Sequence, residues 1–319
     1  MAELTYSDAA KRALTEEMEN DPKVWALGED LGRGGVFGQY AGLIDAFGPA
    51  RIADTPISEG TIMGAAVGAA LVGTRPVVEM RFSDFALCAV DELVNQAAKN
   101  RYMFGGQGRV PIVVRQPMGL WRSSAAQHSQ SLESWYTHVP GLVVVAPSTP
   151  ADNYGLLKSA IRTDDPVVYL EHKDLWSLTG AVADDEHVIE IGKARSVRPG
   201  RDITVVTWSK MAQVAAEAGR LAADDGIDMA IIDLRSLWPW DTEMVLDSVA
   251  DTGRLLVVHE AVQVAGFGAE VAATVAEKTG AAVRRLAGPR IPVADSPPLE
   301  DLFRIGADDI VQAARTMLT

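Results

Sequence analysis

Short apolar segments alternate with helical segments along most of the chain, and this alternation restricts the fold more than any other feature of the sequence. In the first half, segments of strand character cover residues 24–30, 76–82, 110–115, 142–146 and 167–171. In the second half they cover residues 203–208, 229–234, 254–260 and 283–286. Apolar strands separated by helices are typical of mostly parallel sheets with helices on both faces. The sequence therefore predicts a doubly wound α/β fold.

Helical periodicity marks the segments between these strands. The expected helices cover residues 7–20, a small-residue segment that begins at residue 59, and residues 84–104, 150–161, 211–223, 241–249, 266–279 and 307–317. The alternation stops between residue 173 and about residue 195, which indicates a linker. Because 319 residues exceed a typical single core, we expect two α/β domains, residues 1–185 and 196–319, with the linker extending to about residue 195.

The stretch from Asp54 to Gly60 leads into a helix of very small residues that extends to Gly73. Ser58 is expected at the N-cap, which places Glu59 in the first helical turn, where carboxylates are favoured. A structural role at the helix start explains Glu59 on these grounds alone. The small residues that follow also let another backbone or a flat ligand approach closely, so a second interpretation is a partly buried carboxyl that exchanges a proton with a bound heterocycle.

Composition excludes several classes of protein. The net charge is −14 and Lys and Arg are not clustered, which argues against nucleic-acid binding. The start of the sequence lacks the apolar core of a signal peptide, and the longest run of small apolar residues, 62–72, is too short to span a membrane. With a single cysteine, Cys88, there is no internal disulfide. We expect a cytoplasmic protein in which Cys88 is a buried small apolar residue.

Two other places have residue types that suit a binding site. His128 lies in a polar loop after a predicted strand, where open α/β sheets bind their ligands, and a histidine can exchange a proton near neutral pH. A hydrogen-bonded loop histidine is an equally good interpretation. Phe82 and Phe85 flank Asp84 after another strand, so one ring can face a cleft while the other packs in the core, or both rings can pack in the core. The glycines at 32, 34 and 35 lack the spacing of a phosphate-binding loop and predict a turn.

Several ordered motifs cover nearly the whole chain and resemble one family. They are DTPISE at residues 54–59, RPVVEMRFSDF at 75–85, NQAAKNRYMFGG at 95–106, AAQHSQS at 125–131, PGLVVVAPSTPADNYGLL at 140–157, DPVVYLEHK at 165–173 and TGRLLVVHEA at 252–261. In this order they resemble the β subunit of the thiamine diphosphate-dependent decarboxylating component of 2-oxo acid dehydrogenase complexes. The resemblance implies a pyrimidine-binding first domain and a second domain of transketolase C-terminal type.

The resemblance also implies roles for three residues. Glu59, matched through DTPISE, would contact N1′ of the aminopyrimidine and promote the proton exchange that activates the cofactor. Phe85, matched through its motif, would stack near the pyrimidine ring. His128, matched through AQHSQ, would line the substrate channel and assist acyl transfer to a lipoyl group. The chemistry itself belongs to the cofactor, and the protein orients and tunes it.

The diphosphate-binding motif of this family is absent from the chain, so half of the cofactor site is missing. The resemblance therefore implies an α subunit that holds the diphosphate and Mg²⁺, an α2β2 heterotetramer, and a lipoyl transacylase core that docks near the second domain. The small-residue helix after Glu59 would lie at a subunit interface. A binding-only β-like subunit is the non-catalytic alternative.

Some positions depart from the family pattern. Leu120, Trp121 and Arg122 add bulk before AQHSQ, where relatives have small residues, so the substrate channel is expected to differ. An alkali cation site, expected to hold K⁺, is assigned by the resemblance to five positions: Ile112, Ala160, Ile161, Thr163 and Asp165. The motifs are shared by pyruvate, branched-chain and acetoin enzymes, which leaves the substrate open, with acetoin cleavage or ketol transfer by a split transketolase as alternatives.

Overall fold

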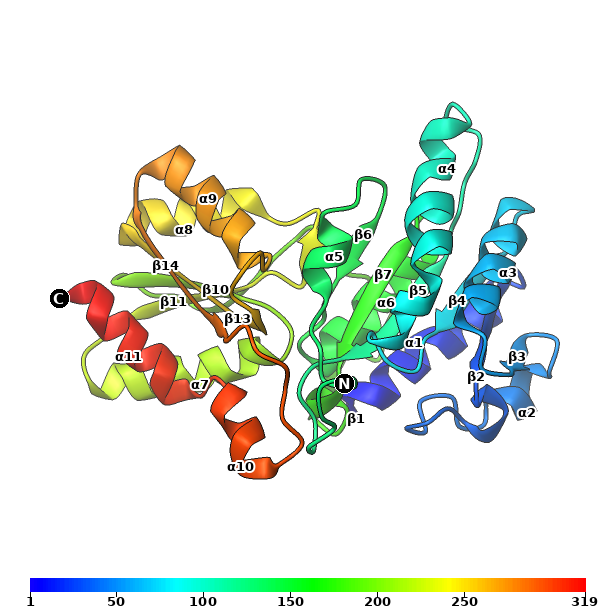
Figure 1. Cartoon of the computed structure of the whole chain (residues 1–319), viewed down its shortest axis with the longest axis horizontal. Helices are drawn as coiled ribbons and strands as arrows, with labels where there is room; N and C mark the ends of the chain where they lie inside the picture. Colours follow the sequence, from blue (N-terminus) through cyan, green and yellow to red (C-terminus); the bar gives the residue numbers. More distant parts are fainter. The chain divides into compact units, whose positions relative to one another are not determined.

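The computed structural model describes all 319 residues, and the chain divides into two compact units (Figure 1). Unit 1 comprises Met1–Met118, Trp135–Val145 and Thr149–Ile191. Unit 2 comprises Gly119–Ser134, Ala146–Ser148 and Gly192–Thr319. A loop from the first half of the sequence, which contains His128, thus belongs to the unit formed by the second half.

The strands of unit 1 form a parallel sheet in the order β6-β7-β5-β4-β2-β3. Their bounds are β2 Val24–Glu29, β3 Ile52–Thr55, β4 Arg75–Glu79, β5 Val113–Met118, β6 Val143–Val145 and β7 Val167–His172. Two further strands, β1 (Ala2–Thr5) and β8 (Thr179–Val182), pair antiparallel with each other. Strands β5 and β7 are buried along their whole length, and β4 is buried after Arg75, as the apolar segments predict.

Helices cover both faces of this sheet. On one face α1 (Tyr6–Asn20) and α6 (Pro150–Arg162) share a core with alternate residues of the strands, such as Val77, Val113 and Val167. On the other face α3 (Glu59–Leu71) packs against β4. Thr5 and Thr149 cap α1 and α6 by accepting bonds from the backbone N–H groups three residues on. Short helices α2 (Leu43–Phe47) and α5 (Glu133–Thr137), which periodicity did not predict, complete the first part of the chain.

The structure corrects three predictions in unit 1. The single helix expected at residues 84–104 is a 3₁₀ turn (Phe85–Ala89), a π-helical turn (Glu92–Ala97) and α4 (Ala98–Met103), which all give similar apolar spacing. Strand β5 begins three residues later than expected, after Pro111, which has no N–H to donate to a ladder. Cys88 is exposed rather than buried, because the 3₁₀ turn directs it away from the core.

Unit 2 has a second sheet in the order β14-β13-β10-β11-β9, in which only β9 is antiparallel. Its strands are β9 Arg195–Arg198, β10 Ile203–Thr207, β11 Met229–Asp233, β13 Arg254–Val262 and β14 Ala282–Gly288, and a short strand, β12, covers Ser236–Trp238. Four helices cover the two faces: α7 (Lys210–Asp224) with α11 (Ala307–Leu318), and α8 (Thr242–Thr252) with α9 (Gly268–Thr279). A one-turn helix, α10, covers Pro297–Glu300. The predicted pair of α/β domains is confirmed.

Candidate functional site

Glu59 is the first residue of α3 and is half-buried. Strand β3 ends at Thr55, and Ser58 occupies the predicted N-cap position. The Ser58 hydroxyl makes no capping bond, although its carbonyl accepts the first helical bond from the Ile62 N–H at 2.9 Å. The first backbone N–H groups of a helix have no helical partners and favour a nearby negative charge. The carboxylate of Glu59 is therefore stabilised at the helix start.

A second carboxylate, Glu29, lies within electrostatic reach of Glu59. Glu29 is the last residue of β2 and is 8% exposed. Burial raises the pKa of the Glu29 carboxyl, the negative charge of Glu59 raises it further, and Arg81 opposes both effects. Sequence reasoning missed Glu29, although a carboxyl at the end of a parallel strand is a usual signal of a site.

Phe82 and Phe85, which flank Asp84, differ in their exposure. Phe82 is buried, whereas Phe85 is half-buried. Their rings meet edge to face with centroids 5.6 Å apart, and Phe82 also contacts Phe37 at 6.0 Å. The turn that carries Phe85 packs against the start of α3, because a Cβ at Gly60 would lie 3.4 Å from the Cys88 carbonyl oxygen. The turns of Glu59 and Phe85 are thus adjacent in unit 1.

A buried ionic network in unit 1 links side chains of β4, β5 and β7. Arg115 donates two bonds to Glu171, at 2.8 and 2.9 Å, and a third to the Tyr40 hydroxyl at 3.2 Å. Tyr40 and Gln39 donate to Glu79 at 3.0 and 3.2 Å. Burial raises the pKa of Glu79 to about 7 despite the nearby Arg115 guanidinium. Burial thus makes Glu79 the carboxyl of this network that can gain a proton near neutral pH.

His128 lies in the loop Gly119–Ser131 of unit 2 and is half-buried. Backbone N–H of Gly119 donates to the Gln130 carbonyl at 3.2 Å and closes the neck of the loop. The three bulky residues that depart from the family pattern lie at its start: Leu120 is buried, and the Arg122 guanidinium lies over the Trp121 ring at 5.2 Å.

The five positions predicted to hold an alkali cation lie around the end of α6 and the starts of β5 and β7: Ile112, Ala160, Ile161, Thr163 and Asp165. The Arg75 guanidinium donates to the carbonyls of Ile161 and Thr163 at 3.1 and 2.8 Å. Arg101 pairs with the Asp165 carboxylate at 2.5 Å. Arg75 and Arg101 thus already place positive charge at the oxygens of these positions.

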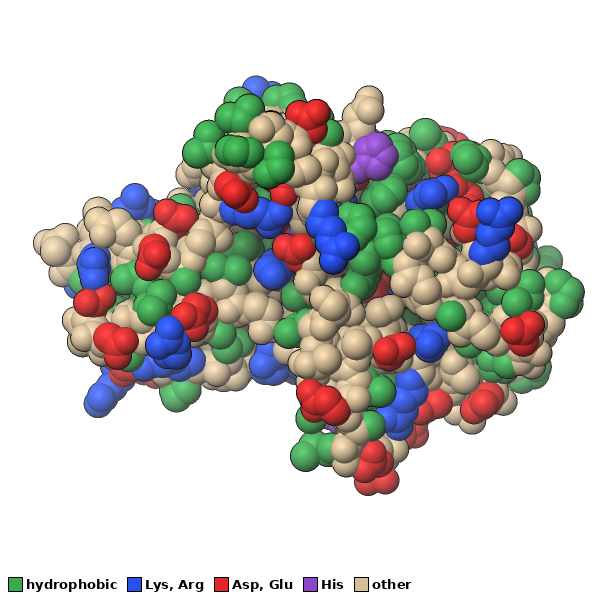
Figure 2. All heavy atoms as spheres, turned by 90° about the horizontal axis from the view of Figure 1, so that it is seen from below, with side chains coloured by type: hydrophobic (Ala, Val, Ile, Leu, Met, Phe, Trp, Pro, Cys, Tyr) green, Lys and Arg blue, Asp and Glu red, His purple; other side chains and the backbone are tan.

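No group of three or more His, Cys, Asp or Glu side chains has an arrangement that could hold a metal ion. The chain also lacks a helix of the length and apolarity that crossing a membrane requires. Acidic and basic side chains are interspersed over the face shown in Figure 2.

The fold and the site define a class of protein. Residues 2–177 match the family "Transketolase, pyrimidine binding domain", and residues 192–310 match "Transketolase, C-terminal domain". A solved structure titled "Split gene transketolase, inactive beta4 tetramer" superposes with a TM-score of 0.81, covering 99% of this chain and 98% of that chain. The two sequences are 22% identical, so this likeness concerns the fold.

Curated relatives narrow the class. The chain is 42% identical to 2-oxoisovalerate dehydrogenase subunit beta of Bacillus subtilis, covering 99% of both chains. It is 43% identical to acetoin:2,6-dichlorophenolindophenol oxidoreductase subunit beta of Cupriavidus necator, covering 98% of this chain and 96% of the relative. It is 42% identical to a mitochondrial pyruvate dehydrogenase E1 component subunit beta-2 of Oryza sativa, covering 98% and 86%. The chain belongs to the family of β subunits of thiamine diphosphate-dependent 2-oxo acid dehydrogenases, as its motifs predict.

Proposed function

We propose that this chain is the β subunit of an enzyme that oxidatively decarboxylates pyruvate or a branched-chain 2-oxo acid and transfers the acyl group to lipoyl groups. The observation that carries the proposal is Glu59, a half-buried carboxyl at the first residue of α3, within electrostatic reach of Glu29. Relatives named for 2-oxoisovalerate and pyruvate dehydrogenase support the choice of substrate.

The described residues fit the pyrimidine half of thiamine diphosphate. Once bound, the cofactor supplies the carbon nucleophile and the electron sink for decarboxylation. Glu59 would exchange a proton with the ring nitrogen N1′ through its carboxyl, and the Glu29 carboxyl would lie within electrostatic reach of it. Phe85, whose ring is half-buried, would stack against the pyrimidine. His128 would line the substrate channel and donate or accept a proton during acyl transfer.

A partner chain completes the proposal. We infer an α subunit that holds the diphosphate and Mg²⁺, with two copies of each chain in the assembly, and a lipoyl transacylase core that docks near unit 2. In support, α3 exposes a stripe of small residues, Gly64, Ala65 and Gly68, followed by exposed Leu71 and Val72. The end of α4 exposes more apolar surface: Tyr102, Met103 and Phe104 are 91%, 69% and 57% exposed. Exposed apolar surface of this kind marks protein interfaces.

The test is co-expression with the α subunit, followed by thiamine diphosphate-dependent reduction of an artificial electron acceptor with pyruvate, branched-chain 2-oxo acids and acetoin. We expect turnover with a 2-oxo acid, and loss of turnover in Glu59→Gln but not in Glu19→Gln, which alters an exposed carboxyl on α1. An assembled, cofactor-loaded complex that oxidises no 2-oxo acid would refute the proposal.

Acetoin cleavage is the second candidate, and the 43% identity to the Cupriavidus necator subunit favours it. The same substrate panel separates the two, because an acetoin enzyme turns over acetoin and leaves 2-oxo acids unchanged. Ketol transfer by a split transketolase has support from the fold only. A binding-only subunit would assemble with the α subunit and show no turnover with any of these substrates.

The cofactor and cation proposals each have a binding test. Because the diphosphate anchor lies on the α subunit, calorimetry should show weak thiamine diphosphate binding by the isolated chain, and tight binding would contradict the heteromeric site. For K⁺ at the end of α6, we expect the melting temperature to rise in KCl relative to choline chloride at equal ionic strength. Equal melting temperatures would contradict the proposed K⁺ site.

A further inference from the structure

The loop that carries His128 has a strained backbone. Arg122, Ser123 and Ala125 have φ values of 45°, 56° and 63°, in the left-handed region that non-glycine residues seldom adopt. A non-glycine residue persists in this region only where surrounding contacts impose it. The loop therefore needs an anchor outside itself to keep its shape.

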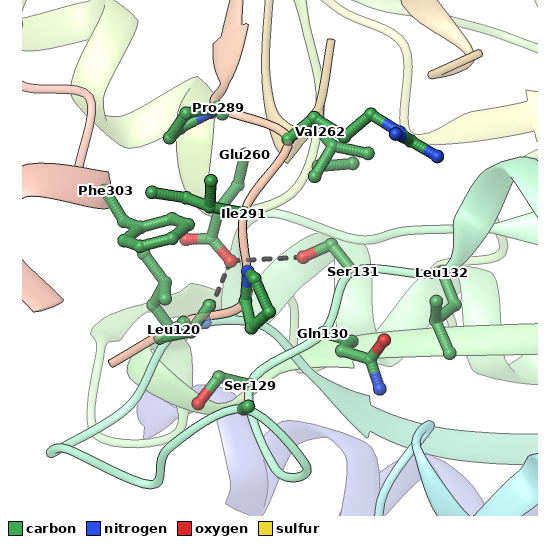
Figure 3. Close-up of a pocket in the computed structure, with 16 residues that line it drawn as sticks. Leu120, Ser129, Gln130, Ser131, Leu132, Glu260, Val262, Pro289, Ile291 and Phe303 are labelled. Atoms are coloured by element: carbon green, nitrogen blue, oxygen red, sulfur yellow. Dashed lines mark hydrogen bonds between the residues drawn. The ribbon is translucent and has the colours of Figure 1, made fainter. Parts of the chain in front are cut away.

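Glu260 provides that anchor. One carboxylate oxygen, Oε1, accepts a bond from the Leu120 N–H at 2.8 Å and another from the Ser131 hydroxyl at 3.1 Å. These two donors lie at opposite ends of the loop. Leu120 follows Gly119 and Ser131 follows Gln130, the two residues joined by the backbone bond at the neck. A single charged acceptor thus joins the two ends of the segment that contains His128 (Figure 3).

The position of Glu260 is itself fixed by the sheet. Glu260 belongs to strand β13, which lies between β10 and β14 in the sheet. Val258 and Ala261 of the same strand are buried. The pairing of β13 with β14 shifts register between His259 and Val262, next to Glu260. Such bulges turn a side chain out of the regular pleat. The bulge therefore accounts for the direction of the carboxylate, out of the sheet and toward the neck of the loop.

Packing does not replace this anchor, because a cavity of about 350 Å³ adjoins the neck. Leu120, Ser131 and Glu260 line it together with Ile291 and Phe303 (Figure 3). Where side chains are not close-packed, few dispersion contacts restrain the backbone. Hydrogen bonds to a charged acceptor are then the main restraint on the loop ends.

We propose that Glu260 is a positioning residue: it holds closed the loop that presents His128 for acyl transfer. The catalytic part of this inference rests on the proposed function. Glu260 acts through the loop and touches no reacting atom, so its effect should appear where His128 acts. A displaced catalytic group can cost about 10²-fold in rate.

The experiment compares Glu260→Ala, Glu260→Gln and the control Glu277→Ala, which alters an exposed carboxyl on α9. Each variant is assembled with the α subunit. Hydrogen exchange of the backbone amides of residues 120–131 reports the loop directly. We expect exchange about 10-fold faster in Glu260→Ala, from the loss of bonds to a charged acceptor. Glu260→Gln should recover most of the protection, because its amide oxygen still accepts from both donors.

Kinetics tests the positioning role. Acyl transfer to a lipoyl domain should fall about 10²-fold in Glu260→Ala, while decarboxylation measured with an artificial acceptor falls much less. In a His128→Ala background the same substitution should change acyl transfer little further, because residues that act through one another are not additive. Additive losses, or loop exchange equal to that of Glu277→Ala, would overturn the proposal.

The proposed function and the role of Glu260 can fail independently, and the measurements distinguish the two. If the wild-type complex turns over no 2-oxo acid, the proposed function fails, and hydrogen exchange still decides whether Glu260 holds the loop. If Glu260→Ala does not fold, Ser131→Ala removes one of the two bonds while the Leu120 N–H bond to Glu260 remains. We then expect a smaller increase in loop exchange, and unchanged exchange would count against the anchor.

Discussion

Glu79 should make the stability of this protein depend on pH, and the substitution Glu79→Gln should remove that dependence. Its carboxyl is 5% exposed and lies 3.6 Å from the Arg115 guanidinium, while Arg115 is held in the bidentate pair with Glu171. Burial raises the pKa of Glu79 from 4.5 to about 7. The folded protein therefore holds this proton more tightly than the unfolded chain does.

The sign of the effect follows directly. The contribution of Glu79 to stability is fully present below about pH 4.5, where the carboxyl is protonated in both states, and it is lost as pH rises through about 7. At 1.36 kcal/mol per unit of pKa, the loss amounts to roughly 3 kcal/mol. Glu79→Gln keeps the shape of the protonated carboxyl and cannot ionise. Its stability relative to the wild type should rise by that amount between pH 4.5 and pH 8.

Urea unfolding of the purified wild-type and Glu79→Gln chains, followed by circular dichroism across this range, measures the difference. Taking the difference cancels every other titrating group that both chains share. A difference between variant and wild type that stays constant within about 0.5 kcal/mol from pH 4.5 to 8 would show that folding leaves the pKa of Glu79 unchanged, which contradicts this prediction.

Four further predictions rest on other side chains. Glu59→Gln should lower cofactor-dependent turnover by at least about 10²-fold, without changing the melting temperature, because the amide cannot relay a proton. Arg115→Met should lower the free energy of unfolding by about 3–5 kcal/mol in urea titrations at pH 7, since it leaves buried carboxylates unpaired. Cys88, which is exposed, should react fully with a maleimide under native conditions, as mass spectrometry would show. Burial lowers the pKa of His259 to about 4, so its contribution to stability should be lost as pH drops from about 6.5 to 4, and the stability of His259→Phe relative to the wild type should rise over that range in the same titration.

The alternation of strands and helices was enough to predict both α/β units, because buried parallel strands leave continuous apolar runs in the sequence. The break in the helix expected at residues 84–104 was not predictable in this way. In this segment the backbone at Cys88 comes close to Gly60 of α3, where a glycine leaves room for it. The sequence does not show that these two residues are neighbours. The exposure of Cys88 depends on the same local geometry.

The candidate site was predictable in part for a related reason. A motif can mark Glu59, Phe85 and His128 individually, but it does not show which residues from distant segments support them. Glu29 comes near Glu59 only through the packing of β2 beside β3. Glu260 meets the loop of His128 across more than a hundred residues of sequence. Long-range pairs of this kind leave no periodic signal in the sequence.

The register of the strands brings the charged residues of the buried network together, although they are far apart in the sequence. In the sequence, Glu79, Arg115 and Glu171 are three charges within otherwise apolar segments. In the sheet, Glu79 pairs with Arg115, and Arg115 pairs with Tyr169, two residues before Glu171. Residues two apart on a strand point to the same face. A shift of one residue in any of these strands would place one charge on the opposite face and leave its partner unpaired. The network therefore specifies the register of β4, β5 and β7.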